Sequence, residues 1–253
     1  MTEILVVHSP IAPLLAEPKI SSELISQRLA GHRLEVLERR DSWLRVRGHD
    51  EYVGWTHDGY LRRQAPDESG SASTRTSLGC TVLGADGQRR QLPLGALLSE
   101  TDRIESGTAL DAESLAKRFP PDAGSVAASA LALFPGTPYL WGGITPWGAD
   151  CSGFVQSVFA LHGVQLPRDA RDQMERVSAE SDAIENAGPA DLLFFSDRDD
   201  GRITHVGISL GGGRMAHVAL GRGGFAVDQL SSDEPYVATL RSRFRGMRRI
   251  ALR

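Results

Sequence analysis

The sequence has little of what would indicate a metal site, a disulfide framework or a membrane anchor. Two of its 253 residues are cysteines, Cys80 and Cys151, and the absence of a CxxC pair lowers the expectation of structural zinc. No apolar run approaches the roughly 18 residues that a membrane span needs, and the N-terminal segment lacks the basic start and apolar stretch of a signal peptide. We therefore expect a cytoplasmic protein with two free thiols.

The charge balance also excludes some partners. The formal net charge is −4 at pH 7, so there is no excess of positive charge to attract nucleic acid or an anionic membrane surface. A hydrophobic content of 41% is ordinary for a globular chain with its own core. Neither nucleic acid nor a membrane is expected as a partner.

The first part of the chain has the pattern of short strands. Short apolar runs separated by turn residues predict a small all-β domain over residues 1–63. The polar stretch at residues 64–77 is typical of a linker. Residues 78–110 predict a second β module with a hairpin at Asp86-Gly87. This module is short for an independent core, so we expect it to pack on its neighbours.

Helical periodicity begins at Asp111. Residues 112–118 and 123–133 are predicted as helices, and helices and strands then follow one another to the end of the chain. The pattern predicts an α+β domain over residues 111–253.

Cys151 lies at the predicted start of a helix. The apolar positions after it recur at helical spacing: Phe154, Val155, Val158, Phe159 and Leu161. Gly163 is predicted to end this helix. The positive end of a helix favours a thiolate, so the position is typical of a nucleophile. A buried structural cysteine is the alternative that this position alone leaves open.

Two histidines lie on successive predicted strands. His205 belongs to ITHVGISLG at 203–211, His217 to RMAHVALG at 214–221, and the glycines at 211–213 predict a hairpin turn between them. Antiparallel pairing would bring the two rings side by side. With Cys151 they would supply a nucleophile, a base and an orienting group. From the residues alone, two core histidines satisfied by local hydrogen bonds remain the alternative.

Several motifs in one fixed order resemble the NlpC/P60 family of papain-like cysteine peptidases. Between residues 112 and 253 the chain contains PYLWGG, DCSGF, LPRD, DLLFF, HVGISLG and MAHV. The resemblance implies a papain-like α+β fold, with Cys151 as nucleophile, His205 as general base and His217 as the polar residue that orients the imidazole. It also implies that no cofactor or metal is needed. The implied substrate is a peptidoglycan stem peptide, cut between γ-D-glutamyl and a diamino acid.

The first domain resembles bacterial SH3-like (SH3b) domains, because its EYVGW is similar to their D-G-Y-x-G-W hairpin. The order SH3b, second β module and NlpC/P60 is similar to the dipeptidyl-peptidase-VI-like branch, the γ-D-glutamyl-L-diamino acid endopeptidases. In that branch the SH3b domain limits the cleft to short peptides with a free N-terminal L-alanine. The resemblance implies that five residues line the cleft or bind the substrate amine: Tyr139, Ser152, Asp169, Glu17 and Tyr52. The second β module is scarcely recognisable as SH3-like.

Other readings of single residues and of the whole chain stay open. Asp169 is a candidate N-cap for a helix beginning near Ala170, and Asp150 is predicted as a turn or cap residue. The leading hypothesis is a cytoplasmic cysteine endopeptidase that recycles wall peptides. The alternatives are a secreted wall hydrolase anchored by its SH3b domain, an inactive wall-binding module, a lipid-directed acyltransferase or amidase, and a metal protein using Cys151, His205 and His217.

Overall fold

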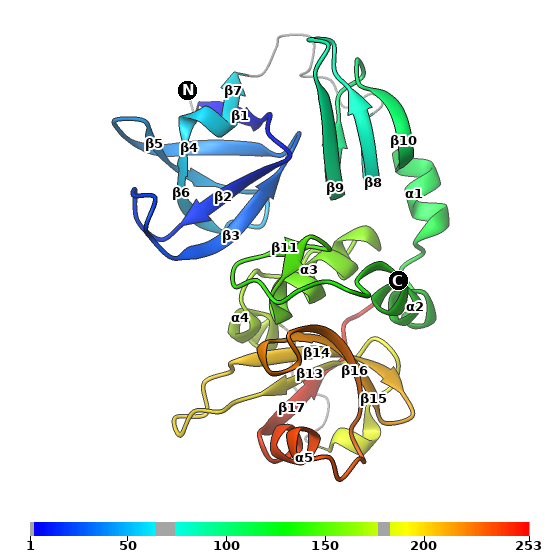
Figure 1. Cartoon of the computed structure of the whole chain (residues 1–253). Coiled ribbons are helices and arrows are strands. Elements are labelled where there is room, and N and C mark those ends of the chain that lie inside the picture. The colour runs from blue at the N-terminus through cyan, green and yellow to red at the C-terminus, as the bar shows by residue number, and fades with distance from the viewer. Residues whose placement is uncertain (1–2, 64–73, 177–182, 253) are drawn as a thin grey trace. The chain divides into compact units, whose positions relative to one another are not determined.

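The computed structural model describes residues 3–63, 74–176 and 183–252, and the chain divides into two compact units, Met1–Arg118 and Phe119–Arg253 (Figure 1). This division differs from the predicted boundary at residue 110, because helix α1 (Ala112–Arg118) packs on strands β8 and β10 of the first unit. Most of the predicted linker lies outside the described residues, and its last residues belong to β8, which begins at Arg75. Among the described residues, no helix is long and apolar enough to cross a membrane.

Antiparallel strands build the first part of unit 1. They form a seven-stranded sheet in the order β3-β2-β6-β5-β4-β1-β7. Their bounds are β1 Ile4–Val7, β2 Ile11–Leu15, β3 Leu24–Leu29, β4 Arg33–Arg40, β5 Trp43–Arg47, β6 Val53–His57 and β7 Leu61–Arg63. In β5, Leu44 and Val46 are fully buried while Arg45 between them is exposed, as the alternating sequence predicts. The all-β prediction for this segment is confirmed.

The second β module is a three-stranded sheet in the order β10-β8-β9. Its strands are β8 (Arg75–Leu83), β9 (Arg89–Leu98) and β10 (Arg103–Leu110), and Gly87 has the positive φ that the predicted hairpin turn requires. The module packs on the first sheet: the Leu97 N–H donates to the Ala30 carbonyl at 2.8 Å, and His32 Nε2 lies 3.3 Å from the Gly95 carbonyl oxygen. The expectation that it packs on its neighbours is confirmed.

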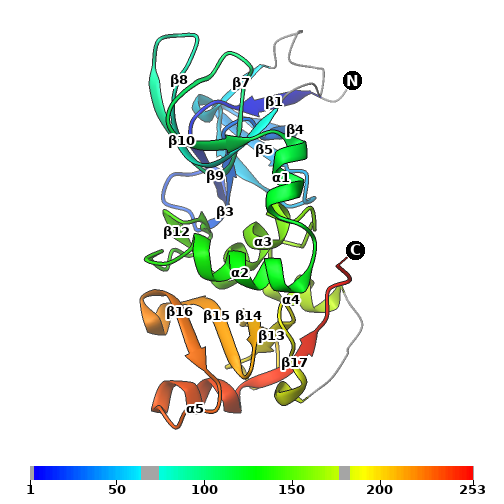
Figure 2. The same cartoon turned by 90° about the vertical axis from the view of Figure 1, so that its right-hand side faces the viewer.

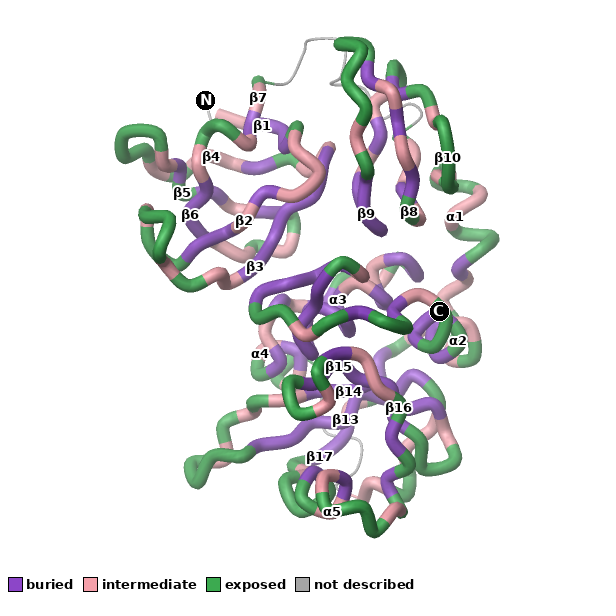
Figure 3. The backbone as a smooth tube through the Cα atoms, viewed as in Figure 1, coloured by how far each residue is buried: buried purple, intermediate pink, exposed green. Residues whose placement is uncertain are grey.

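A five-stranded antiparallel sheet in the order β16-β15-β14-β13-β17 forms the centre of unit 2. Its strands are β13 Leu192–Phe195, β14 His205–Gly211, β15 Arg214–Ala219, β16 Gly224–Gln229 and β17 Phe244–Arg248. Figures 1 and 2 show helices α2 (Ala123–Leu133) and α3 (Cys151–Leu161) on one face and α5 (Pro235–Ser242) on the other. The central strands are buried along most of their length (Figure 3).

Helix α3 is held in place by its apolar face. Four of its side chains are fully buried: Phe154, Val155, Val158 and Phe159. Each contributes about 1.5–3 kcal/mol by leaving water, so together they fix the helix firmly against the sheet. The helix ends as predicted, with Gly163 at φ +74° and its N–H bonded to the Ala160 carbonyl. The short hairpin of β11 (Ile144–Thr145) and β12 (Gly148–Ala149) precedes α3, and α4 (Ala170–Glu175) follows it.

Candidate active site

Asp150 caps helix α3 and so fixes Cys151 at the first helical position. Its Oδ1 accepts the Gly153 N–H at 2.8 Å, and its Oδ2 accepts the Gly142 N–H at 2.8 Å. Both donors are backbone groups that a buried loop and helix start must satisfy. The prediction that Asp150 is a cap is confirmed.

The glycine of the DCSGF motif has a steric reason. A Cβ atom on Gly153 would lie 2.1 Å from the Gly143 carbonyl oxygen, far inside van der Waals contact. The loop that precedes the cysteine therefore lies against the first turn of α3 only because this position has no side chain. The close approach fixes the backbone on both sides of Cys151.

Arg168 forms a buried ion pair with Asp150 that the sequence analysis did not predict. Arg168 Nη2 lies 2.6 Å from Asp150 Oδ2, and Nη1 lies 3.0 Å from Oδ1, in the bidentate geometry of a guanidinium and a carboxylate. The two side chains are 1% and 6% exposed. Arg168 is the third letter of LPRD, and that motif is the only sequence signal that points to it.

The Cys151 thiol is buried between the start of α3 and strand β14. Only 7% of the residue is exposed, and the backbone amides of Val206 and Ser152 lie close enough to act on the pKa of its thiol. Burial, reinforced by the charge of Asp150, raises the pKa of Cys151 to about 12. The prediction of a thiolate stabilised by the helix end is therefore wrong at neutral pH, because loss of solvation outweighs the lowering effect of the nearby backbone amides and the Arg168 charge.

The two predicted histidines lie side by side, as expected from the hairpin. His205 Nε2 is 2.8 Å from His217 Nδ1, and the turn between β14 and β15 places Gly211, Gly212 and Gly213 at positive φ. Burial and the neighbouring His217 lower the pKa of His205 to about 3, although Asp228 acts in the opposite direction. A neutral imidazole beside a protonated thiol can accept its proton as the sulfur attacks.

Asp228 and Arg222 extend this chain of side chains and were missed by the sequence analysis. Asp228 Oδ2 lies 2.9 Å from His217 Nε2, and Arg222 Nη2 donates to Asp228 Oδ1 at 2.7 Å. Burial raises the pKa of Asp228, but the bonds from His217 and Arg222 outweigh it and lower the pKa below its usual value. The sequence signal that could have identified Asp228 is an acidic residue on the strand that follows MAHV.

Tyr139 lies near the nucleophile. Its backbone N–H donates to the Gly223 carbonyl at 3.0 Å, and the side chain is half-buried. Burial and the nearby Cys151 and Asp150 raise the pKa of the phenol well above its usual value. The hydroxyl therefore keeps its proton and can donate a hydrogen bond to a developing oxyanion.

Ser152 and Asp169 flank Arg168. The Ser152 hydroxyl accepts a hydrogen bond from Arg168 Nη1 at 2.9 Å and donates to Asp150 Oδ1 at 3.3 Å, so it belongs to the buried network. Asp169 stands at the N-cap position of α4, but its side chain makes no capping hydrogen bond. Asp169 is therefore the N-cap residue of this helix, as predicted, although its side chain does not cap it, and amine binding by either residue remains a prediction.

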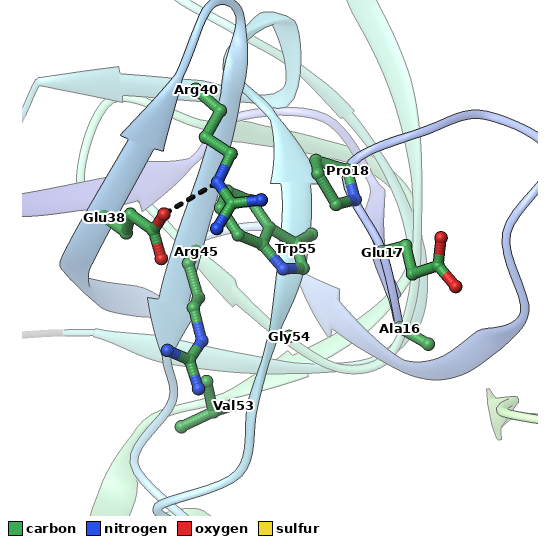
Figure 4. A pocket seen from close by; sticks show the side chains of 9 residues that line it. All are labelled: Ala16, Glu17, Pro18, Glu38, Arg40, Arg45, Val53, Gly54 and Trp55. Atoms are coloured by element: carbon green, nitrogen blue, oxygen red, sulfur yellow. Dashed lines mark hydrogen bonds and ion pairs between the residues drawn. The ribbon is translucent and has the colours of Figure 1, made fainter.

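Glu17 and Tyr52 belong to unit 1, whereas the other six predicted site residues belong to unit 2. Glu17 is exposed and pairs with Lys19 at 2.6 Å. It lines a pocket of about 340 Å³, whose wall also contains Arg40, Arg45 and Trp55 (Figure 4). Tyr52 is partly exposed and is not among the residues lining this pocket. Substrate binding by both residues remains a prediction.

The metal alternative has little support in the geometry. No group of three His, Cys, Asp or Glu side chains in the described ranges is arranged to hold an ion. Both ring nitrogens of His217 are also committed, one to His205 and the other to Asp228. The arrangement instead provides a nucleophile, a neutral base and an orienting chain, which is the set that acyl transfer through a thioester requires.

Two family matches cover separate parts of the chain. Residues 136–243 match the NlpC/P60 family, and residues 14–60 match the bacterial dipeptidyl-peptidase Sh3 domain. The chain is 46% identical over 87 residues to a gamma-D-glutamyl-L-lysine dipeptidyl-peptidase of Bacillus subtilis (strain 168), which covers 34% of this chain and 29% of that protein. It is 28% identical over 265 aligned positions to dipeptidyl-peptidase 6 of Lysinibacillus sphaericus, covering 91% of this chain and 93% of the relative.

A solved structure shares the fold over nearly the whole chain. An NlpC/P60 family protein from Bacillus cereus ATCC 10987 matches with a TM-score of 0.80 and 19% identity, covering 97% of this chain and 99% of that one. The predicted fold class, an α+β papain-like domain after SH3-like β modules, is confirmed. The resemblance to both families is confirmed as well.

Proposed function

Because the chain carries an NlpC/P60 cysteine peptidase domain together with a bacterial SH3 domain, we propose that it cleaves peptides derived from peptidoglycan. The bond is the amide between γ-D-glutamyl and a diamino acid, and the preferred substrate is a short stem peptide with a free N-terminal L-alanine. The observation that carries the proposal is that Cys151 begins helix α3, which packs on strands β14 and β15, and that these two strands hold the hydrogen-bonded pair His205 and His217.

Before the reaction, the Cys151 thiol and the His205 imidazole are both uncharged. His205 takes the proton from the Cys151 thiol as the sulfur attacks the γ-glutamyl carbonyl carbon, since the raised pKa of the thiol means that no free thiolate is present beforehand. The C–N bond then breaks, and His205 passes the proton to the departing amine of the diamino acid. Water attacks the thioester, releases the peptide carboxylate and restores the thiol.

The negative charge on the carbonyl oxygen needs donors during attack. The first N–H groups of a helix have no partner within the helix, so the Cys151 N–H at the start of α3 is one donor. The Tyr139 hydroxyl, which keeps its proton, is the second. Each such donor contributes on the order of 10²-fold or more to kcat in enzymes of this mechanistic type.

Relatives support the choice of bond. The B. subtilis relative is named for a dipeptidyl-peptidase activity on gamma-D-glutamyl-L-lysine, and the L. sphaericus relative is also named a dipeptidyl-peptidase. A dipeptidyl-peptidase removes two residues from a free N-terminus. We carry this preference to the present chain, with L-Ala-γ-D-Glu as the released dipeptide.

Recognition of a free N-terminus needs a carboxylate near the substrate ammonium. Asp169 is half-buried at the start of α4 and follows Arg168, whose guanidinium is bonded to Asp150 and Ser152 on either side of Cys151 in the sequence. A buried ammonium is stable only with such a charged partner. We assign the amine subsite to Asp169 and Ser152, and we propose that Glu17 and Tyr52 of the SH3 domain also take part in substrate binding.

The test compares two substrates and two variants. Mass spectrometry follows products from L-Ala-γ-D-Glu-diaminopimelate and from its N-acetylated form, and acetylation is expected to lower kcat/KM by on the order of 10²-fold or more. Asp169→Asn should lose rate on the free-amine peptide but little further on the acetylated one, because one interaction cannot be lost twice. Asp172→Asn, on the same helix and paired with Arg171, is the matched control and should behave as the wild type.

Two outcomes would change the proposal. Equal rates on the free and acetylated peptides would remove the amine subsite. Efficient digestion of purified sacculi, whose alanine is acylated, would favour a secreted wall hydrolase anchored by its SH3 domain. The proposed role in cytoplasmic recycling of wall peptides is tested separately, by fractionating cells that express the tagged full-length protein.

A further inference from the structure

We propose that Asp228, oriented by Arg222, is a positioning residue that sets the tautomer of His205 through His217. In this tautomer His205 Nε2 carries the proton and Nδ1 is free to accept the proton of Cys151. The inference rests on the proposed function only for its catalytic consequence. The tautomer itself is a property of the protein alone.

The Asp228 carboxylate determines which nitrogen of His217 carries a proton. An ionised Asp228 can only accept hydrogen bonds, so the His217 Nε2 that lies 2.9 Å away must carry a proton. His217 is completely buried, and a neutral imidazole has only one N–H. Its other nitrogen, Nδ1, is therefore an acceptor.

The acceptor nitrogen of His217 in turn determines the proton position on His205. His217 Nδ1 lies 2.8 Å from His205 Nε2, and an acceptor at this distance requires a donor opposite it. His205 Nε2 must therefore hold the single proton of that neutral ring. By elimination His205 Nδ1 has the lone pair. The backbone amide of Val206, one residue along, lies close enough to Cys151 to lower the pKa of its thiol, so the sulfur is near this end of β14.

The strand pairing makes the contact between His217 and Asp228. Across β15 and β16, His217 is opposite Ala226, so Asp228 is its diagonal neighbour two positions further on and on the same face. The Asp228 side chain thereby lies beside His217 while its other oxygen faces Arg222.

Arg222 both orients the Asp228 carboxylate and balances its charge. Its Nη2 donates to Asp228 Oδ1 at 2.7 Å, which fixes the plane of the carboxylate and balances its charge. The charge balance matters because it keeps Asp228 ionised and therefore an acceptor only. The guanidinium is itself held by Glu234 at 2.6 Å and by the Tyr236 ring, whose centroid lies 4.2 Å away.

This geometry predicts an unusual effect of Asp228→Asn. The Arg222 donor will keep the acceptor oxygen of the asparagine on its side, so the asparagine NH₂ will face His217. His217 Nε2 must then accept, its Nδ1 must donate, and His205 must carry its proton on Nδ1. The base would be blocked by a change that leaves volume and fold almost unaltered.

The experiment measures tautomers and kinetics in parallel. Long-range ¹H–¹⁵N spectra of the labelled full chain report which nitrogen of each of the seven histidines is protonated, with assignments from single substitutions. The wild type should show His205 and His217 protonated on Nε2. Asp228→Asn should reverse both and lower kcat by on the order of 10³- to 10⁴-fold with KM changed less than about threefold, as expected for a base held in the wrong tautomer.

Asp233→Asn is the matched control, because it makes the same carboxylate-to-amide change at an exposed residue five positions further along the chain and leaves Asp228, Arg222 and Glu234 in place. It should keep the wild-type tautomers, with kcat within about threefold of the wild type. A wild type with His205 protonated on Nδ1 overturns the inference even if the variant fails to fold. So does an Asp228→Asn variant with unchanged tautomers, or one no slower than Asp233→Asn. A wild type that cleaves no stem peptide refutes the proposed function instead and leaves the tautomer result standing.

Discussion

Arg168→Met tests whether a buried ion pair holds the start of the nucleophile helix. Methionine keeps the length and much of the volume of the arginine stem but removes the guanidinium. The Asp150 carboxylate would then keep the Gly142 and Gly153 N–H groups and the Ser152 hydroxyl, with no cation to balance its charge. Because the Asp150 side chain is 6% exposed, water cannot replace the lost partner.

The expected cost follows from that burial. Breaking a buried pair by removing one partner destabilises a protein by about 3–5 kcal/mol, since a charge is left without compensation. For a unit of this size that corresponds to a fall of about 10–20 °C in the unfolding midpoint. The double variant Arg168→Met/Asp150→Asn removes both charges, so it should be more stable than the sum of the single changes predicts.

Differential scanning calorimetry of the full chain measures the shift of the unfolding midpoint, because the two units can unfold as separate transitions. Hydrogen exchange of α3 amides identifies which transition belongs to unit 2. Arg171→Met is the matched control: this arginine lies on the exposed side of α4, half-exposed beside Asp172, and its loss should leave both midpoints unchanged. A loss in Arg168→Met below about 1 kcal/mol would refute the argument that this pair holds the helix start.

Three further predictions concern the thiol, the helix start and the first unit. In a Cys80→Ala background, the rate of Cys151 alkylation by iodoacetamide should rise about tenfold per pH unit between pH 7 and 9, because a thiol pKa of about 12 leaves little thiolate. A rate that does not change with pH would indicate a preformed thiolate instead. Gly153→Ala should lower both kcat and the unit 2 midpoint, since its Cβ would meet the Gly143 oxygen at 2.1 Å; wild-type behaviour would contradict the close approach. Burial lowers the pKa of His32 from 6.5 to about 3, so the unfolded state binds a proton that the folded state resists. Unit 1 should therefore have its full stability above pH 6.5 and lose up to about 1.4 kcal/mol per pH unit below it, and His32→Gln should flatten that slope in calorimetry.

The sequence alone was sufficient for features that depend on neighbours along the chain. Alternation in β5, helical spacing after Cys151 and the three glycines at 211–213 are local patterns, and each predicted its element correctly. The pairing of His205 with His217 also follows locally, because a tight hairpin fixes which residues face each other. Ordered motifs then identified the family.

Only the tertiary structure determined which groups distant in the sequence are in contact and which of them carry a proton. Arg168 and Asp150 are 18 residues apart, and Asp228 reaches His217 only because β16 returns beside β15. The protonation state of Cys151 was predicted wrongly from its place at a helix end, because the sequence does not show how completely a thiol is removed from water. Helix α1 likewise belongs to unit 1 through packing on β8 and β10, a contact that no local pattern encodes. Periodicity depends on neighbours in the chain, whereas desolvation and charge pairing depend on whatever the fold brings within a few ångströms.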